Sequence, residues 1–241
     1  MDSVQQQFIE LLEPHGIHLT EGQLSQFETY YRELVDWNER MNLTGITERK
    51  QVYLKHFFDS LSLSFYVSME DHAALADIGS GAGFPSIPLK IVYPHLQVTI
   101  VDSLNKRIQF LNYLSMSLGL SNVTCVHGRA EDIARQAAHR DRYDLVTARA
   151  VARLAVLNEF CLPFTSVDGL FIAMKGQDVG DELQEAKRSL QELQAEVVET
   201  HRFILPIEES VRHLVIAKKI AATPTPYPRK AGIPLKEPLL S

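Results

Sequence analysis

The sequence predicts an α/β fold, in which a Rossmann-like, doubly wound sheet of seven strands, mostly parallel with one antiparallel strand, carries a helical N-terminal extension. Three observations lead to this prediction. From residue 73 onward, short apolar runs alternate with helical patterns, as they do in a parallel sheet. A glycine-rich segment at residues 77–85 joins the first of these runs to a helix. Residues 1–68 have helical periodicity and no strand-like run.

The N-terminal extension, residues 1–68, is expected to contain three helices. Residues 3–13 have an amphipathic pattern that breaks at Pro14 and Gly16. A second helix begins near Thr20, a typical N-cap residue, and its apolar residues recur at helical spacing. Residues 51–66 predict the third helix.

The sheet domain is expected at residues 69–220. The expected strands are residues 74–78, 97–101, 123–127, 143–148, 168–174, 195–203 and 212–218, and the expected helices are residues 85–93, 104–118, 130–137, 151–161 and 178–190. The last two strands follow each other without a long helix, which predicts a hairpin with one antiparallel strand. Residues 221–241 are rich in proline and basic side chains, which predicts an extended, mobile tail.

Residues 77–85 read Asp-Ile-Gly-Ser-Gly-Ala-Gly-Phe-Pro and predict a cofactor seat. Gly79, Gly81 and Gly83 allow a sharp turn and a close approach to a ligand. The helix that follows directs its N-terminal N–H groups at that ligand. The third glycine comes two residues after the second, whereas it comes three residues after the second in a dinucleotide fingerprint.

Asp102 narrows the choice of ligand. It ends the second strand-like run, where a carboxylate accepts the hydroxyls of a ribose. Asp77 is placed to reach a cationic amino group through the loop. A ligand with a ribose and a cationic end, but no pyrophosphate, is S-adenosylmethionine rather than NAD. The competing interpretation is a glycine turn that only packs a helix on a sheet.

The strand pattern supports the same choice. A sheet of seven strands that ends in a hairpin is the class I methyltransferase variant of this fold, and the chain leaves no room for the second domain of a dehydrogenase. Ligands of such sheets lie at the carboxyl ends of the strands. The loops expected there are residues 79–84, 102–104, 128–132 and 147–149, and Glu131 or Asp132 would meet the adenine amino group. Acidic residues also favour helix starts for purely structural reasons.

Composition restricts the class of protein. The chain has 241 residues, a net charge of -6 and 45% hydrophobic residues, which is typical of one substantial globular core. No apolar run approaches the roughly 20 residues that span a bilayer. Cys125 and Cys161 predict reduced thiols in a cytoplasmic protein and have no metal-ligand spacing. We therefore expect no membrane and no metal as partners, and a monomer.

The residues also match a known family over nearly the whole chain. The matching segments are Trp37-Asn38, Asn42-Leu43-Thr44, His56 with Asp59-Ser60-Leu61, Asp77 through Leu89, Asp102-Ser103, Lys106-Arg107, Arg129-Ala130-Glu131, Arg149-Ala150-Val151, Lys175-Gly176 and the ending Tyr227-Pro228-Arg229-Lys230 with Gly232 and Pro234. The chain resembles the bacterial 16S ribosomal RNA guanine-N7 methyltransferases, the glucose-inhibited division protein B family. Phe84-Pro85 and the Tyr-Pro-Arg-Lys ending are far more specific than the glycines.

The resemblance implies methyl transfer from S-adenosylmethionine to N7 of one guanine near the decoding centre of the small ribosomal subunit. The cofactor contacts that it implies, beside Asp77, Gly81 and Gly83 of the loop, are Gly79, Phe84, Asp102, Ser103, Leu104, Ala130, Glu131 and Arg149. Ser86 departs from the family, which usually has glycine there. A small residue in a first helical turn is expected to preserve cofactor binding and to reshape the loop slightly.

The chemistry of guanine N7 needs no general base, because this nitrogen carries a lone pair and no proton. Catalysis by alignment contributes roughly 7–11 kcal/mol, so we expect no acid–base pair and assign no catalytic residue. Arg149 is the candidate for orienting the cofactor or the guanine. His56 and Asp59 are expected to tie the extension to the core. The candidates for contact with the RNA backbone are Lys106, Arg107, Lys175, Arg229 and Lys230.

Two other functions fit the same motifs. One is a methyltransferase that acts on a small molecule or a protein. The other is a non-catalytic ribosome-assembly or regulatory factor that keeps the cofactor seat, against which the complete set of loop glycines and Asp102 argues. The sequence does not distinguish free RNA, an assembling particle and a mature subunit as the substrate.

Overall fold

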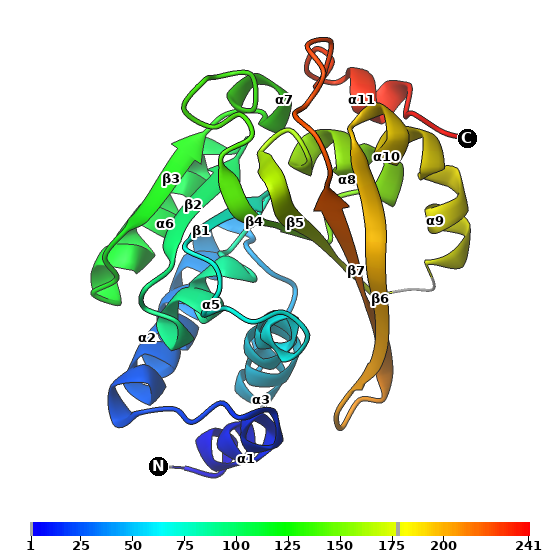
Figure 1. Cartoon of the computed structure of the whole chain (residues 1–241). Coiled ribbons are helices and arrows are strands. Elements are labelled where there is room, and N and C mark those ends of the chain that lie inside the picture. The colour runs from blue at the N-terminus through cyan, green and yellow to red at the C-terminus, as the bar shows by residue number, and fades with distance from the viewer. Residues whose placement is uncertain (1, 177–178) are drawn as a thin grey trace.

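The chain folds around one seven-stranded sheet (Figure 1), as the sequence predicts. The computed structural model describes residues 2–176 and 179–241. The strand order is β3-β2-β1-β4-β5-β7-β6; β7 is antiparallel to both of its neighbours, β5 and β6, and the other paired strands are parallel. The strands are β1 (Ala74–Ile78), β2 (Gln97–Asp102), β3 (Val123–His127), β4 (Tyr143–Arg149), β5 (Thr165–Lys175), β6 (Ala195–Leu205) and β7 (Ser210–Lys219).

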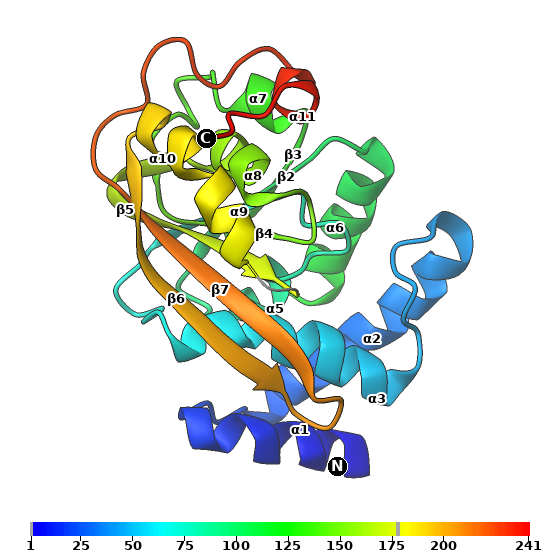
Figure 2. The same cartoon turned by 90° about the vertical axis from the view of Figure 1, so that its right-hand side faces the viewer.

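Helices cover both faces of this sheet (Figures 1 and 2). The helical elements of the extension are α1 (Ser3–Leu12), η1 (Glu13–His15), α2 (Glu21–Met41), α3 (Arg49–Val52), η2 (Tyr53–Phe58), α4 (Asp59–Leu61) and η3 (Ser62–Phe65). The others are α5 (Ser86–Val92), α6 (Asn105–Ser117), α7 (Ala130–Ile133), α8 (Leu154–Cys161), α9 (Gly180–Glu185), α10 (Lys187–Glu192) and α11 (Ile233–Lys236).

Two apolar cores lie on the opposite faces of the sheet. The first joins side chains of the extension, such as Phe8 and Phe57, to α5 and α6 residues such as Ile87 and Phe110. The second is built mainly from α8 and α10 against β4, β5 and β7. The extension therefore shares a continuous hydrophobic core with the sheet domain, which fixes its position relative to the strand ends.

The second helix of the extension begins as predicted. Thr20 and Gln23 form a reciprocal capping box, with the Gln23 N–H donating to the Thr20 hydroxyl and the Thr20 N–H donating to the Gln23 side chain. The helix expected at residues 51–66 is instead divided, and η2 is a π-helix. A π turn inserts one extra residue into the helical ladder, and such turns are frequent at functional sites.

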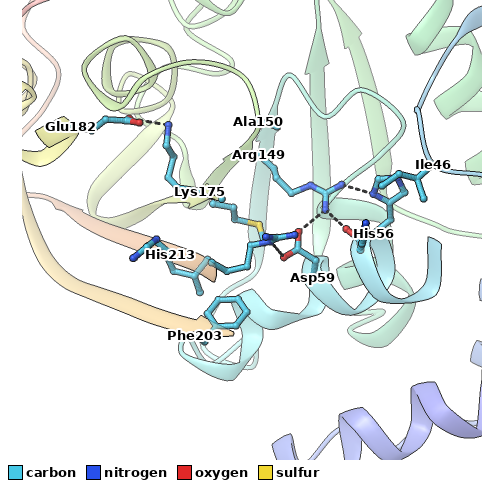
Figure 3. A pocket seen from close by; sticks show the side chains of 14 residues that line it. Ile46, His56, Asp59, Arg149, Ala150, Lys175, Glu182, Phe203 and His213 are labelled. Atoms are coloured by element: carbon cyan, nitrogen blue, oxygen red, sulfur yellow. Dashed lines mark hydrogen bonds and ion pairs between the residues drawn. The ribbon is translucent and has the colours of Figure 1, made fainter. Parts of the chain in front are cut away.

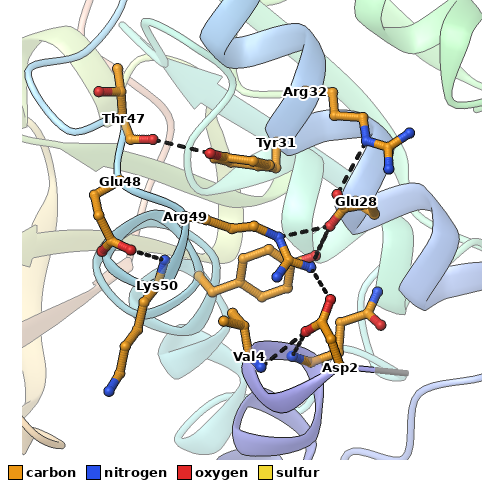
Figure 4. Close-up of polar contacts among 11 residues, drawn as sticks. Asp2, Val4, Glu28, Tyr31, Arg32, Thr47, Glu48, Arg49 and Lys50 are labelled. Atoms are coloured by element: carbon orange, nitrogen blue, oxygen red, sulfur yellow. Dashed lines mark hydrogen bonds and ion pairs between the residues drawn. The ribbon is translucent and has the colours of Figure 1, made fainter.

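Arg49 holds the segments of the extension together (Figure 4). Its guanidinium donates to Glu28 of α2, with an Nη2-to-Oε2 distance of 2.6 Å, and to Asp2 before α1, at 2.8 Å. The Tyr53 hydroxyl donates to the same Glu28 oxygen. Three parts of the extension therefore meet at one charged group.

The β6–β7 hairpin contacts the extension at its far end (Figure 2). Ile207 in the hairpin loop lines one small cavity together with Val4, Phe8 and Leu11 of α1. Lys55 of η2 forms an ion pair with Glu208, with a nitrogen-to-oxygen distance of 2.6 Å. The extension is thus joined to both the middle and the edge of the sheet.

The prediction of a mobile tail is wrong, because residues 221–241 pack against the core and include α11. Arg135 donates to the carbonyls of Pro226 and Pro228, and Arg140 donates to those of Thr223, Pro224 and Tyr227. Lys219, which is fully buried, donates to Asp141 and to the Thr223 hydroxyl. The prolines stiffen the tail, and arginines far away in the sequence bind its free carbonyls.

Three expected helices have different bounds for tertiary reasons. The helix expected at residues 130–137 ends at Ile133, because Arg135 turns toward the tail. The helix expected at residues 151–161 begins at Leu154, whose N–H donates to the Glu182 carboxylate. The helix expected at residues 178–190 is divided into α9 and α10, and its first residue lies outside the described residues.

The described residues contain no helix long and apolar enough to cross a membrane. No group of three or more His, Cys, Asp or Glu side chains among them is placed to hold a metal ion. Cys125 and Cys161 are both free thiols.

Candidate functional site

The glycine loop lies between β1 and α5 and has the conformation that its glycines were expected to provide. Gly79, Gly81 and Gly83 have φ angles of 76°, 62° and 100°, a region that side chains rarely adopt. A Cβ at Gly79 would lie 2.9 Å from Val151, and one at Gly83 would lie 2.8 Å from the Tyr30 hydroxyl. Gly81 has open space instead, so this glycine is the one that faces outward.

The extension supports the loop from below. The Tyr30 hydroxyl on α2 donates to the Ala82 carbonyl at 2.6 Å. The Phe84 ring, which is buried, stacks between Tyr30 and His56, with centroid distances of 5.3 Å and 4.5 Å. Phe84 is therefore a packing residue that joins the loop to the extension.

Asp77 lies beneath the loop and is fully buried. Its Oδ2 accepts the N–H of Ser86 at 3.1 Å, while its Oδ1 has no hydrogen-bond partner among the residues that the structure describes. Burial raises the pKa of Asp77 to about 7. Its carboxylate positions the start of α5 through Ser86, the residue that departs from the family.

Asp102 ends β2 beside the loop and is 2% exposed. Its Oδ1 accepts the N–H of Leu104, and its Oδ2 accepts the N–H of Gly81 at 3.2 Å and a longer bond of 3.4 Å from Arg107. Ser103 and Leu104 are exposed beyond it. Asp102 therefore joins the ends of β1 and β2, and Arg107 lies over its carboxylate.

Ala130 and Glu131 begin α7 after β3. Glu131 is 2% exposed, and its Oε1 accepts the N–H of Gly232 in the tail at 2.8 Å. The adjacent Asp132 is exposed. One Glu131 oxygen thus holds the tail, a contact that the expected role toward adenine did not include.

Arg149, the last residue of β4, points toward the extension. Its guanidinium donates to the Lys55 carbonyl at 3.1 Å, to Asp59 Oδ2 at 2.9 Å and to His56 Nδ1 at 3.2 Å. It also lies over the Phe84 ring, 4.9 Å from the centroid. The expectation that His56 and Asp59 tie the extension to the core is confirmed, with Arg149 as the intermediate.

His56 is held neutral in this arrangement. Burial, together with the neighbouring Arg149 charge, lowers the pKa of His56 to about 3. Because Arg149 can only donate, His56 Nδ1 is the acceptor and Nε2 carries the proton. Nε2 lies 2.8 Å from the Thr44 hydroxyl, to which it therefore donates. Both ring nitrogens are occupied, and His56 is not available as a base.

A cavity of about 570 Å³ opens on the β5 side of Arg149 (Figure 3). Its lining comes from the extension, the ends of β4 and β5, α9, and the hairpin: Ile46, Lys55, His56, Asp59, Arg149, Ala150, Met174, Lys175, Gly176, Glu182, Phe203, Arg212, His213 and Leu214. The glycine loop and Asp102 lie on the other side of Arg149 and do not line it. Arg149 is therefore the boundary between the predicted cofactor seat and this cavity.

Arg212 and His213 on β7 also belong to the site, although neither is among the predicted site residues. Arg212 donates to Asp59 Oδ1 at 2.9 Å, so the Asp59 carboxylate lies between two arginines. His213 is buried. The sequence signal for these two residues is a pair of polar positions at the start of an otherwise apolar strand. Such a pair is normally interpreted as the end of a strand.

The five candidate RNA contacts have different surroundings. Lys106 is exposed at the start of α6, and Lys230 is exposed in the tail. Lys175 lines the cavity and pairs with Glu182 at 2.9 Å. Arg229 makes a two-pronged contact with the buried Glu159, with distances of 2.7 Å and 3.0 Å. This contact leaves Arg229 as a tail anchor rather than a free cation, and Arg107 lies on Asp102.

The comparisons with known proteins agree with this architecture. A family model described as rRNA small subunit methyltransferase G matches residues 23–215. A ribosomal RNA small subunit methyltransferase G of Halalkalibacterium halodurans is 55% identical over 233 residues, which cover 97% of this chain and 98% of that protein. The protein of the same name from Bacillus licheniformis is 54% identical over 234 residues, with the same coverage.

A solved structure shows the same fold at lower identity. It is a SAM-dependent O-methyltransferase from Thermotoga maritima, with a TM-score of 0.51, 20% identity, and coverage of 79% of this chain and 72% of that chain. The family match covers most of the sheet domain and much of the extension. On this match and the identity to full-length relatives, the chain belongs to the rRNA small subunit methyltransferase G family.

Proposed function

We propose that this protein transfers the methyl group of S-adenosylmethionine to N7 of a guanine in the 16S RNA of the small ribosomal subunit. The observation that carries the proposal is the identity of more than half of the residues to rRNA small subunit methyltransferases G along almost the whole chain. The substrate places the enzyme in the bacterial cytoplasm, and one chain is the expected functional unit.

The glycine loop and the neighbouring strand ends fit this cofactor. The outward-facing Gly81 leaves room for a ligand above the loop, where a Cβ would meet nothing within 4 Å. Gly79 and Asp102 would hold the adenosine part, with Ser103, Leu104 and Ala130 around it, and Arg107 would move from the Asp102 carboxylate. Asp77 and Phe84 support the loop from below, and Ser86 anchors Asp77. S-adenosylmethionine supplies an electrophilic methyl group.

The chain's own residues would then act by positioning. Arg149, bound to Asp59 and His56, fixes the end of β4 beside the extension. A guanine at this boundary would be held with N7 toward the cofactor seat, and alignment of this kind contributes roughly 7–11 kcal/mol. His56 has both nitrogens engaged and Asp59 is bound by two arginines, which suits a reaction in which no proton has to be removed.

Lys106 and Lys230 are the proposed contacts for the RNA backbone, because both are exposed cations. Lys175 and Arg107 are proposed to join them when RNA binds, each leaving its present carboxylate partner. Arg229 has a structural role through Glu159 instead.

The experiment is a mass map of 16S RNA from cells with and without the gene, together with calorimetry of S-adenosylmethionine binding to the purified protein. We expect one guanine to lose 14 mass units in the deletion strain, which is the replacement of a methyl group by hydrogen, and the loss to be reversed by the wild-type protein. An unchanged guanine pattern would contradict the proposal, and cofactor binding without RNA methylation would favour another substrate.

A further inference from the structure

One side chain in the lining of the cavity has a buried ring nitrogen without a hydrogen-bond partner among the described residues. Among the described lining residues, Lys55 pairs with Glu208, Lys175 pairs with Glu182, and Asp59 binds Arg149 and Arg212. His213 differs from them, because it is 7% exposed and its Nδ1 is buried without a hydrogen-bond partner. Buried polar atoms almost always have a partner, so this nitrogen points to a ligand of the cavity.

The position of His213 restricts that ligand. His213 lies opposite Lys175 in the β5–β7 register, at the carboxyl end of β5. Figure 3 shows its ring on the side of the cavity away from His56, below the Lys175–Glu182 pair. The ligand would therefore extend from the Arg149 boundary toward β7, with one end near the cofactor seat and the other near His213.

The lining suits a nucleotide base. The volume of about 570 Å³ lies within the roughly 300–1,000 Å³ of small-ligand sites. Met174, Phe203 and Leu214 give apolar surface for the faces of a base. The lining has four cationic side chains and two carboxylates, and Lys55 also pairs with Glu208 outside the lining, so one positive charge remains to favour an attached phosphate: Lys55, Arg149, Lys175 and Arg212 against Asp59, Glu182 and Glu208.

Guanine can form a hydrogen bond with the unpartnered His213 Nδ1 when N7 of the base is the reacting atom. With N7 directed at the cofactor seat, the opposite edge of the base, which carries N1–H and the N2 amino group, is directed away from it. Enzymes that act on a base taken out of its stack read that edge by hydrogen bonds. A neutral imidazole nitrogen accepts from N1–H or N2–H of guanine. Adenine presents no donor at either position.

We propose that this cavity receives the target guanine and that His213 Nδ1 accepts a hydrogen bond from its N1–H or N2–H group. His213 is then a specificity-determining residue of the methyltransferase, and the inference rests on the function proposed above. Arg149 lies beside the opening through which N7 faces the cofactor seat, and the cations around the cavity bind the flanking phosphates.

The test uses the full-length protein and small subunits reconstituted with guanosine, inosine or 2-aminopurine riboside at the target position. Inosine lacks the N2 amino group, and 2-aminopurine lacks the proton on N1. We expect the wild-type enzyme to methylate at least one analogue about 10- to 100-fold more slowly in kcat/KM, the range of one lost buried hydrogen bond. The sensitive analogue identifies the atom that His213 contacts.

Two variants connect this discrimination to His213. His213→Leu removes the acceptor and is expected to lower kcat/KM on guanosine subunits about 10- to 100-fold and to abolish discrimination against the sensitive analogue. His213→Asn keeps an acceptor oxygen near the Nδ1 position and is expected to restore most of both. S-adenosylmethionine affinity, measured by calorimetry, is expected to stay unchanged. His201→Leu, at a partly exposed side chain of β6 that does not line the cavity, is the matched control and is expected to behave as wild type.

The outcomes separate the two proposals. A wild-type enzyme that methylates no guanosine subunit overturns the proposed function. A wild-type enzyme that methylates guanosine and both analogues equally well overturns the inference, even if His213→Leu does not fold. Equal discrimination by wild type and His213→Leu also overturns it, because a residue that only packs the strand does not couple to one atom of the substrate.

Discussion

Asp59 and Arg212 lie 153 positions apart in the sequence, and the Asp59 carboxylate accepts a hydrogen bond from the Arg212 Nε at 2.9 Å. The other oxygen of the same carboxylate binds Arg149 at the same distance. One acidic side chain of the extension therefore fixes the end of β4 and the start of β7 together. The Asp59 carboxylate therefore supports both the cavity and the predicted cofactor seat.

Replacement of Asp59 is expected to damage the fold and the site together. Asp59→Ala leaves two partly buried arginines facing each other, and loss of one partner of a buried ion pair costs about 3–5 kcal/mol. We expect a decrease near the lower end of that range in the free energy of unfolding, measured by urea titration, and a loss of methylation. Asp36→Ala, which breaks the exposed pair with Arg40, is the control and should change stability by less than about 0.5 kcal/mol. Equal effects of the two substitutions on stability would contradict this supporting role of Asp59.

The glycines at positions 79 and 81 are expected to respond differently to the same change. Gly79→Ala and Gly81→Ala both place a side chain at positive φ, which costs about 1–2 kcal/mol. Only the Cβ at position 79 meets Val151, at 2.9 Å. We expect Gly79→Ala to be the more destabilising of the two in thermal melts.

A double variant separates contact from backbone strain. Val151→Ala is expected to restore part of the stability lost in Gly79→Ala and none of that lost in Gly81→Ala. If Val151→Ala restores neither variant or both to the same extent, the 2.9 Å contact is not the cause.

The buried carboxylate of Asp77 gives a pH dependence of known sign. Its pKa is about 7 in the folded protein against 3.8 for a free side chain. Between these values the folded state holds more protons than the unfolded state, so the contribution of Asp77 to stability is present below pH 3.8 and is lost as the pH rises through about 7.

The measurement compares the wild type with Asp77→Asn, which cannot ionise and keeps an oxygen for Ser86. Free energies of unfolding of the cofactor-free proteins are measured from pH 4 to pH 8. We expect the variant to gain stability relative to the wild type as the pH rises. A constant difference across this range would mean that Asp77 has the same pKa in both states.

The Glu159–Arg229 contact is expected to hold the tail on the core. Glu159→Ala leaves the Arg229 guanidinium without its carboxylate, and Glu159 is 1% exposed. We expect faster amide exchange and faster proteolysis in residues 223–241, with weaker S-adenosylmethionine binding because Gly232 no longer fixes Glu131. Glu185→Ala, which breaks the more exposed pair with Arg153, is the control. Unchanged exchange in the tail would contradict this role.

Sequence periodicity was enough for the strands, because buried parallel strands have an apolar pattern that local sequence contains. The glycine loop was also predictable, since Gly79, Gly81 and Gly83 all require positive φ. The surroundings of the site could not be predicted from the sequence. Arg212, His213 and the tail reach it through contacts with residues 78 to 153 positions away, such as Lys219 with Asp141 and Arg212 with Asp59, and no local pattern encodes such pairings.

The same limit applies to Arg135 and Arg140. Each donates to backbone carbonyls of a proline-rich segment that has no sheet partner for them. Charged residues in a sequence are predicted to lie on the surface of the protein. Only the folded chain shows that these charges are used internally.

Gly232 is translated after every strand of the sheet, and its N–H binds Glu131, made 101 positions earlier. The strands and the glycine loop emerge from the ribosome long before that bond is possible. A chain that stops before Gly232 would therefore contain the whole sheet and the glycine loop and still lack the closure of its α7 wall. The α7 wall is therefore closed only after the ribosome has made the whole sheet.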